Sequence, residues 1–121
     1  MKKQVLIVDD KSSIAKVVSI YLKKDFDFIY FDNAIKAIAW LNEGHNPDII
    51  ISDLRMPEMS GVEFIKYIKN NELLKFIPII VLSSEDSSTE KIKLLDSGVS
   101  DYIVKPFNPM ELKIRINKIL N

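Results

Sequence analysis

The chain has 121 residues with seventeen basic and seventeen acidic side chains, so its length suits one domain and its zero net charge excludes a polycation that binds nucleic acid through overall charge. Cysteine is absent, which excludes disulfide scaffolds and thiol catalysis, and a single histidine argues against a histidine-based triad or metal site. Three scattered glycines form no glycine-rich phosphate loop.

Two lysines near the N-terminus precede an apolar run, residues 5–8, which Asp9 and Asp10 bring to an end. A signal peptide needs a longer apolar core, and a membrane span needs about 20 apolar residues. We therefore expect a cytoplasmic protein that makes no contact with a membrane.

Five short runs rich in β-branched residues predict strands. In chain order they cover residues 5–8, 28–31, 49–51, 77–82 and 102–104. Three of them are apolar almost throughout, which favours strands buried on both faces of a parallel sheet. Asp27 and Asp32 flank the second run, so we expect that strand toward an edge of the sheet.

Between these runs, apolar residues recur with the spacing of a helix face. The stripes are Ile14, Val17, Val18, Tyr21 and Leu22; Ala34, Ala37, Ile38 and Leu41; Val62, Ile65 and Ile68; Ile92, Leu94 and Leu95; and Leu112, Ile116, Ile119 and Leu120. Residues that favour helix starts precede them: Ser12 or Ser13, Asn33, Ser60, Ser87 or Ser88, and Asn108 before Pro109. The alternation predicts a single doubly wound (βα)5 domain of the α/β class, with a parallel five-stranded sheet and helices on both faces.

Charged and hydroxyl side chains stand where four of the expected strands end. They are Asp9 and Asp10, Asp53, Ser83, and Lys105. Sites in open parallel sheets form outside the carboxyl ends of the strands, so we expect these groups to converge. Three clustered carboxylates repel one another unless a cation neutralises them, and oxygen ligands of this kind favour Mg²⁺. The lysine and the serine suit phosphoryl oxygens, and an aspartate is a known type of nucleophile for phosphoryl groups.

The residues at these strand ends carry a resemblance to a known family. Residues 5–10 (VLIVDD), residues 53–61 (DLRMPEMSG), Ser83 and residues 101–107 (DYIVKPF) resemble the receiver domains of bacterial two-component response regulators. The match spans essentially the whole chain, with its landmarks in the expected order. It implies one receiver domain over residues 1–121 and the strand order 2-1-3-4-5.

The resemblance implies a phosphorylation site. Asp53 would accept a phosphoryl group from a sensor histidine kinase, a histidine phosphotransfer protein or a small-molecule donor. The implied Mg²⁺ ligands are Asp9, Asp10, Asp53 and the backbone carbonyl of Arg55. Arg55 and Glu85 would flank the path of hydrolytic water. The chain would be no enzyme beyond catalysing its own phosphorylation and dephosphorylation.

The resemblance also implies a switch. Lys105 would pair with the acceptor carboxylate and then with the phosphoryl group, and Pro106 would follow a cis peptide bond. Ser83 would bond to the phosphoryl group while Tyr102 swings inward behind it. The change would reach the face made by the fourth helix, fifth strand and fifth helix, which would serve a downstream target, an output domain or a homodimer, without direct contact to nucleic acid.

Other functions are less consistent with these residues. A phosphatase of the haloacid-dehalogenase type needs an aspartate two positions after its nucleophile, where this chain has Arg55. A flavodoxin-like FMN binder should present hydroxyls and amides after the first strand, where this chain has two carboxylates. A pseudo-receiver that binds partners without phosphorylation stays open, and so does the choice between a stand-alone regulator and a piece of a longer chain. His45 lies in a turn-forming stretch and is expected to be merely exposed.

Overall fold

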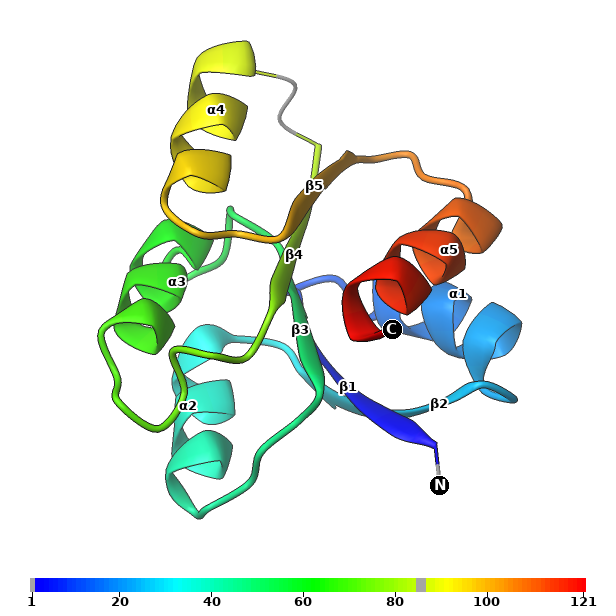
Figure 1. The fold of residues 1–121 in the computed structure, drawn as a ribbon, viewed down its shortest axis with the longest axis horizontal. Helices are drawn as coiled ribbons and strands as arrows, with labels where there is room; N and C mark the ends of the chain where they lie inside the picture. Colours follow the sequence, from blue (N-terminus) through cyan, green and yellow to red (C-terminus); the bar gives the residue numbers. More distant parts are fainter. Residues whose placement is uncertain (1, 85–86) are drawn as a thin grey trace.

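The computed structural model describes residues 2–84 and 87–121, in which strands and helices alternate along the chain (Figure 1). The strands are β1 (Lys3–Val8), β2 (Phe26–Phe31), β3 (Ile49–Ser52), β4 (Ile79–Ser83) and β5 (Asp101–Val104). The helices are α1 (Ser12–Leu22), α2 (Ala34–Asn42), α3 (Gly61–Lys69), α4 (Ser88–Asp96) and α5 (Pro109–Leu120). Within the described ranges no helix has both the length and the apolar character needed to cross a membrane.

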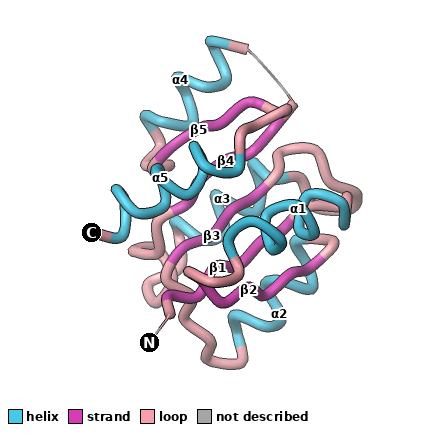
Figure 2. The backbone as a smooth tube through the Cα atoms, turned by 90° about the vertical axis from the view of Figure 1, so that its right-hand side faces the viewer, coloured by secondary structure: helices cyan, strands magenta, loops and turns pink. Residues whose placement is uncertain are grey.

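The five strands form one parallel sheet in the order β2-β1-β3-β4-β5, and Figure 2 shows them side by side. The predicted fold class is therefore confirmed, including the edge position of β2. The bounds of each strand differ from the prediction by one or two residues, and only β4 begins later than predicted, at Ile79 rather than at Ile77. Pro78 has no N–H to donate to a sheet, although its carbonyl still accepts a hydrogen bond from the Ile50 N–H at 2.9 Å.

The helices cover the two faces of the sheet unequally, with α2, α3 and α4 on one face and α1 and α5 on the other (Figure 1). Successive residues of a strand point to opposite faces of the sheet, so β1 contributes side chains to the hydrophobic core on each face. Leu6 and Val8 pack with the first group of helices, whereas Val5 and Ile7 pack with the second. A sheet buried on both faces holds its strand ends in fixed positions, which matters for the site that lies there.

Four of the five predicted helix starts are confirmed. Asn33, Ser60 and Ser87 each accept a hydrogen bond from the backbone N–H three residues later, and Asn108 caps α5 through the Met110 N–H. The prediction for α1 is wrong, because the helix begins at Ser12 and no serine caps it. Instead, the Lys11 N–H before the helix donates to the Asp9 carboxylate at 2.9 Å.

Two of the predicted apolar helix stripes are only partly buried. In α1, Val18 and Leu22 are buried but Tyr21 is exposed, so the buried stripe is narrower than its spacing suggested. In α4, Leu94 is buried whereas Ile92 and Leu95 are exposed. Both helices lie at the margin of the sheet, where a helix contacts its neighbours along a narrow line and leaves the rest of its surface to solvent.

Candidate functional site

The register of the sheet aligns the ends of β1, β3, β4 and β5. Val8 pairs with Ser52, and Ser83 pairs with Val104. Backbone hydrogen bonding continues one residue further, because the Asp53 N–H donates to the Val8 carbonyl at 3.0 Å and the Lys105 N–H donates to the Ser83 carbonyl at 2.8 Å. The residues that carry the predicted site are therefore held by the sheet itself rather than by free loops.

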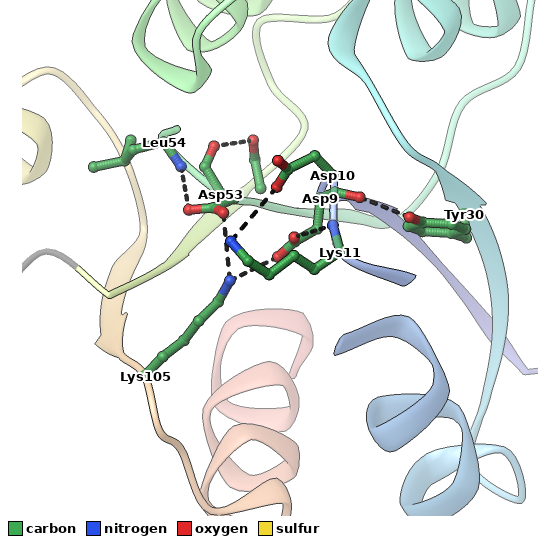
Figure 3. Close-up of polar contacts among 8 residues, drawn as sticks. Asp9, Asp10, Lys11, Tyr30, Asp53, Leu54 and Lys105 are labelled. Atoms are coloured by element: carbon green, nitrogen blue, oxygen red, sulfur yellow. Dashed lines mark hydrogen bonds and ion pairs between the residues drawn. The ribbon is translucent and has the colours of Figure 1, made fainter. Parts of the chain in front are cut away.

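Asp53 follows β3 and is buried. Its Oδ1 accepts a hydrogen bond from the Leu54 N–H at 2.7 Å, which sets the orientation of the carboxylate, and its Oδ2 faces Lys105 Nζ at 3.4 Å (Figure 3). One oxygen is thus tied to the backbone while the other faces a cation across the rim of the sheet. This arrangement presents a fixed carboxylate at the centre of the strand ends.

Asp9, after β1, makes the closer contact with Lys105. The ammonium lies 2.8 Å from Asp9 Oδ2 and 3.4 Å from Asp53 Oδ2, so the expected pair with Asp53 is present and Asp9 lies closer still. Burial raises the pKa of the Asp9 carboxyl above its usual value, and the hydrogen bonds from Lys105 and from the Lys11 N–H only partly offset that effect. Negative charge on Asp9 is therefore incompletely compensated by the chain.

Asp10 completes the acidic cluster from a more open position. Each of Asp9, Asp10 and Asp53 offers a carboxylate oxygen, and these oxygens lie within 4.8 Å of one another. The Asp10 side chain is 33% exposed, and Lys11 Nζ lies 4.0 Å from its Oδ1. The cluster therefore has two buried members and one that faces solvent.

The cluster fits a hard divalent cation. Three carboxylate oxygens from three side chains form a donor set that Mg²⁺ accepts, and the one exposed member leaves room for waters and a phosphoryl oxygen. The raised pKa of Asp9 indicates a site in which further positive charge is favourable. Arg55, whose carbonyl was the fourth predicted ligand, follows Asp53 by two residues on the same loop, with an exposed side chain.

The predicted switch residues are both buried in the sheet. Ser83 is the last residue of β4 and is fully buried, and Tyr102, the second residue of β5, is 3% exposed. The peptide bond between Lys105 and Pro106 is cis, as the resemblance implied. Glu85, which the resemblance places beside the path of hydrolytic water, lies outside the described residues. His45 is exposed and stacks on Trp40, with ring centroids 4.2 Å apart.

Two residues near the site were missed by sequence reasoning. A Cβ added to Gly61 would lie 2.0 Å from the Asp53 carbonyl oxygen, so only glycine lets α3 begin this close to the loop after β3. Tyr30 in β2 donates a hydrogen bond from its hydroxyl to the Asp9 carbonyl at 2.7 Å. The glycine stood in a motif that could have drawn attention to it, whereas the tyrosine contact depends on the register between β1 and β2.

The comparison with protein families decides what kind of chain carries this cluster. A family model described as the response regulator receiver domain matches residues 5–117. The chain belongs to the response regulator receiver family. This receiver thus presents its acidic cluster at the carboxyl ends of the parallel strands.

Relatives and solved structures agree with that assignment. The receiver is 32% identical over 121 residues to the phosphate regulon transcriptional regulatory protein PhoB of Escherichia coli, covering 99% of this chain and 52% of PhoB. It is 32% identical over 119 residues to the chemotaxis protein CheY1 of Helicobacter pylori, covering 97% of this chain and 96% of CheY1. The structure of the chemotaxis response regulator CheY4 of Vibrio cholerae matches it with a TM-score of 0.89 and 34% identity, covering 99% of this chain and 100% of that one.

The receiver spans about half the length of the PhoB relatives and nearly the full length of CheY1. PhoB is a transcriptional regulatory protein and CheY1 is a chemotaxis protein, so the same kind of domain occurs in proteins of different roles. Family membership therefore leaves the output of this receiver to be argued separately.

Proposed function

We propose that residues 1–121 form one cytoplasmic receiver domain that accepts a phosphoryl group on Asp53 in the presence of Mg²⁺. The observation that carries the proposal is the convergence of three carboxylates with one ammonium at the ends of the strands. A sensor histidine kinase, a histidine phosphotransfer protein or a small-molecule donor supplies the phosphoryl group. The chain is a signalling phosphoacceptor that catalyses only its own phosphorylation and dephosphorylation.

The chemical step is an in-line displacement at phosphorus. A carboxylate oxygen of Asp53 forms the new oxygen–phosphorus bond while the bond from phosphorus to the donor's leaving nitrogen or oxygen breaks, and the electron pair departs with the leaving group. The hydrogen bond from the Leu54 N–H to Oδ1 holds the carboxylate in place for attack. Bound Mg²⁺ supplies charge neutralisation for the phosphoryl oxygens, and Asp9, Asp10, Asp53 and the Arg55 carbonyl are the groups that would hold it.

Lys105 has two successive partners in this proposal. Before phosphorylation its ammonium contacts Asp9 at 2.8 Å and Asp53 at 3.4 Å. As negative charge develops on the equatorial oxygens of the phosphoryl group, the same ammonium donates to one of them. It is 13% exposed, so little water competes for its hydrogen bonds, and its attraction to the phosphoryl oxygen is stronger than it would be in solvent.

The signal then passes from the site to the face formed by α4, β5 and α5. We assign Ser83 the role of donating its hydroxyl to a phosphoryl oxygen, and Tyr102 the role of filling the buried space behind it. Phosphorylation would stabilise the inward position of Tyr102. The fourth helix, which leaves Ile92 and Leu95 exposed, would change its contacts in response.

That face suits a protein partner. Ile92 of α4 and Ile114 of α5 are 65% and 57% exposed, and β5 and α5 also carry paired charges of both signs, Asp101 and Arg115. Apolar side chains surrounded by paired charges are typical of a protein interface with a polar rim. We assign this face to a downstream target, an output domain or a second copy of the receiver in a symmetric dimer.

Acetyl phosphate tests the proposal directly. Incubation of the full chain with Mg²⁺ and acetyl phosphate should increase its intact mass by one phosphoryl group. The added group should be released by hydroxylamine, which cleaves an acyl phosphate and leaves a serine phosphate intact. The Asp53→Asn variant should gain no mass, because an amide is not a nucleophile for this reaction.

A matched control uses an aspartate on the same sheet. Asp101 begins β5 and pairs with Arg115 away from the acidic cluster, so Asp101→Asn should be phosphorylated like the unaltered receiver. An unaltered receiver that gains no mass, with acetyl phosphate or with a kinase, would instead support the pseudo-receiver that binds partners without phosphorylation.

A further inference from the structure

The backbone of Asp9 is held from the neighbouring strand by two hydrogen bonds. Its N–H donates to the Phe31 carbonyl at 3.2 Å, and its carbonyl accepts from the Tyr30 hydroxyl at 2.7 Å. Both partners come from β2, the edge strand, which contributes no carboxylate to the cluster. In Figure 3, Tyr30 approaches Asp9 from the side opposite to Asp53 and Lys105. The carbonyl of Asp9 is therefore drawn away from the acidic cluster.

This contact bears on Asp10 through the peptide plane. The carbonyl of Asp9 and the N–H of Asp10 belong to one rigid planar unit, so fixing the carbonyl also fixes the direction in which Asp10 leaves the strand. The Asp10 side chain has little else to hold it, because Lys11 Nζ is 4.0 Å away and the lysine side chain is 67% exposed. Exposed ion pairs of that kind contribute little orientation.

Packing holds the tyrosine ring in place for this bond. The ring is partly buried and lies against the core between the sheet and α1. Tyr30 also lines a cavity of about 380 Å³ together with Asp10 and Asp32.

We propose that Tyr30 is a positioning residue for the divalent cation, because its hydroxyl holds the peptide between Asp9 and Asp10 so that the Asp10 carboxylate remains within the cluster. The inference rests on the proposed function, since it concerns the cation of that site. Tyr30 itself contacts neither the cation nor the phosphoryl group. Its effect is to reduce the freedom of the exposed ligand before the cation arrives.

The Tyr30→Phe variant tests this role, because it keeps the buried ring and removes only the hydroxyl. Isothermal titration of the full chain with Mg²⁺ should give a dissociation constant about threefold to tenfold higher than that of the unaltered receiver, the range expected for one hydrogen bond. Tyr67→Phe is the matched control, since its hydroxyl bonds to Asn42 at 3.2 Å between α2 and α3, and its dissociation constant should be unchanged.

A second readout separates positioning from general stability. Urea unfolding should show that Mg²⁺ stabilises Tyr30→Phe less than it stabilises the unaltered receiver or Tyr67→Phe at the same concentration. A Tyr30→Phe variant that is merely less stable without metal, with an unchanged dissociation constant, would overturn the positioning role and leave the proposed function standing. An unaltered receiver that binds no Mg²⁺ would overturn the proposed function itself.

Discussion

The rim of strand ends and the outer side of α5 both place one cation between two carboxylates. At the rim, Lys105 contacts Asp9 at 2.8 Å and Asp53 at 3.4 Å. On α5, Arg115 contacts Asp101 at 2.8 Å and Glu111 at 3.0 Å. The contacts are similar but the burial is not, since the Asp9 side chain is 2% exposed and the Arg115 side chain is 40% exposed.

The pKa shifts in the two regions have opposite effects on the charged forms of their side chains. Burial raises the pKa of the Asp9 carboxyl, which disfavours its charged form, whereas the hydrogen bonds that Arg115 donates to Asp101 and Glu111 raise the pKa of Arg115, which favours its charged form. Asp10 adds a third carboxylate at the rim. The two carboxylates that contact Arg115 are thus paired within the chain, whereas the rim brings three carboxylates together. Similar ion pairs therefore stand in different electrostatic surroundings.

Replacing the basic side chain of each region should produce the largest difference between the two regions, measured as the rate of phosphorylation. Lys105→Met should slow phosphorylation by acetyl phosphate about 10²-fold or more, as expected when a donor to a developing oxyanion is lost. Arg115→Met should leave the rate within about twofold, because its charge is paired away from the reacting atoms. Intact-mass time courses measure both rates, and equal rates in the two variants would remove the distinction between the regions.

A substitution at Gly61 tests whether the stability of the protein depends on close backbone packing at the rim. In Gly61→Ala the new methyl would meet the Asp53 carbonyl oxygen at 2.0 Å and Leu54 Cα at 2.6 Å, so the free energy of unfolding should fall by about 2 to 3 kcal/mol. Gly44→Ala is the matched control, since its methyl enters open space and only its φ of +100° is unfavourable, for a loss of about 1 kcal/mol. Urea unfolding compares them, and an equal loss would contradict the close packing.

The pH dependence of the free energy of unfolding should report the raised pKa of Asp9 at the rim. Because the pKa of Asp9 is higher in the folded protein than its usual 3.8, the folded state binds that proton more tightly than the unfolded chain does. The contribution of Asp9 to the free energy of unfolding should therefore fall as pH rises from 3.8 through the raised folded value, and stay constant above it. Asp9→Asn should lose this decline when metal-free protein is unfolded in urea across that pH range. An unchanged difference between variant and unaltered receiver at every pH would contradict the shift.

The smallest effect should come from the stability contribution of the α5 pair. Arg115→Met should lower the free energy of unfolding by about 0.2 to 1 kcal/mol, the range for exposed ion pairs, and added salt should shrink the difference. Urea unfolding at low and high salt measures it. A loss that is larger than this and insensitive to salt would show that solvent screens the pair as little as it screens the buried pair at the rim. That result would contradict the distinction between the two regions.

Much of the site could be predicted because it depends on which residues follow each strand in the sequence. In a parallel sheet every carboxyl end lies at one edge, so the positions at which the apolar runs end were enough to predict that Asp9, Asp53 and Lys105 converge. The helix caps at Asn33 and Ser60 were equally accessible, because capping is a local interaction within three residues.

Contacts between elements could not be predicted in the same way. The hydroxyl of Tyr30 reaches Asp9 only because β1 and β2 pair with Ile7 opposite Tyr30, and no local pattern specifies that register. The preference of Lys105 for Asp9 over Asp53 depends on differences of less than an ångström. The exposure of Tyr21 and Ile92 likewise depends on how each helix packs against its neighbours, which the apolar spacing alone does not specify.

The sequence by itself determined the alternation of five strands and five helices, the edge at which the site forms and the excess of acidic groups there, because periodicity and strand direction are properties of short segments. Tertiary structure alone decided which carboxylates are buried, which one Lys105 approaches most closely and which neighbouring strand holds their backbone. Burial and hydrogen bonding of this kind depend on residues that lie far apart in the chain and come into contact only when the sheet forms.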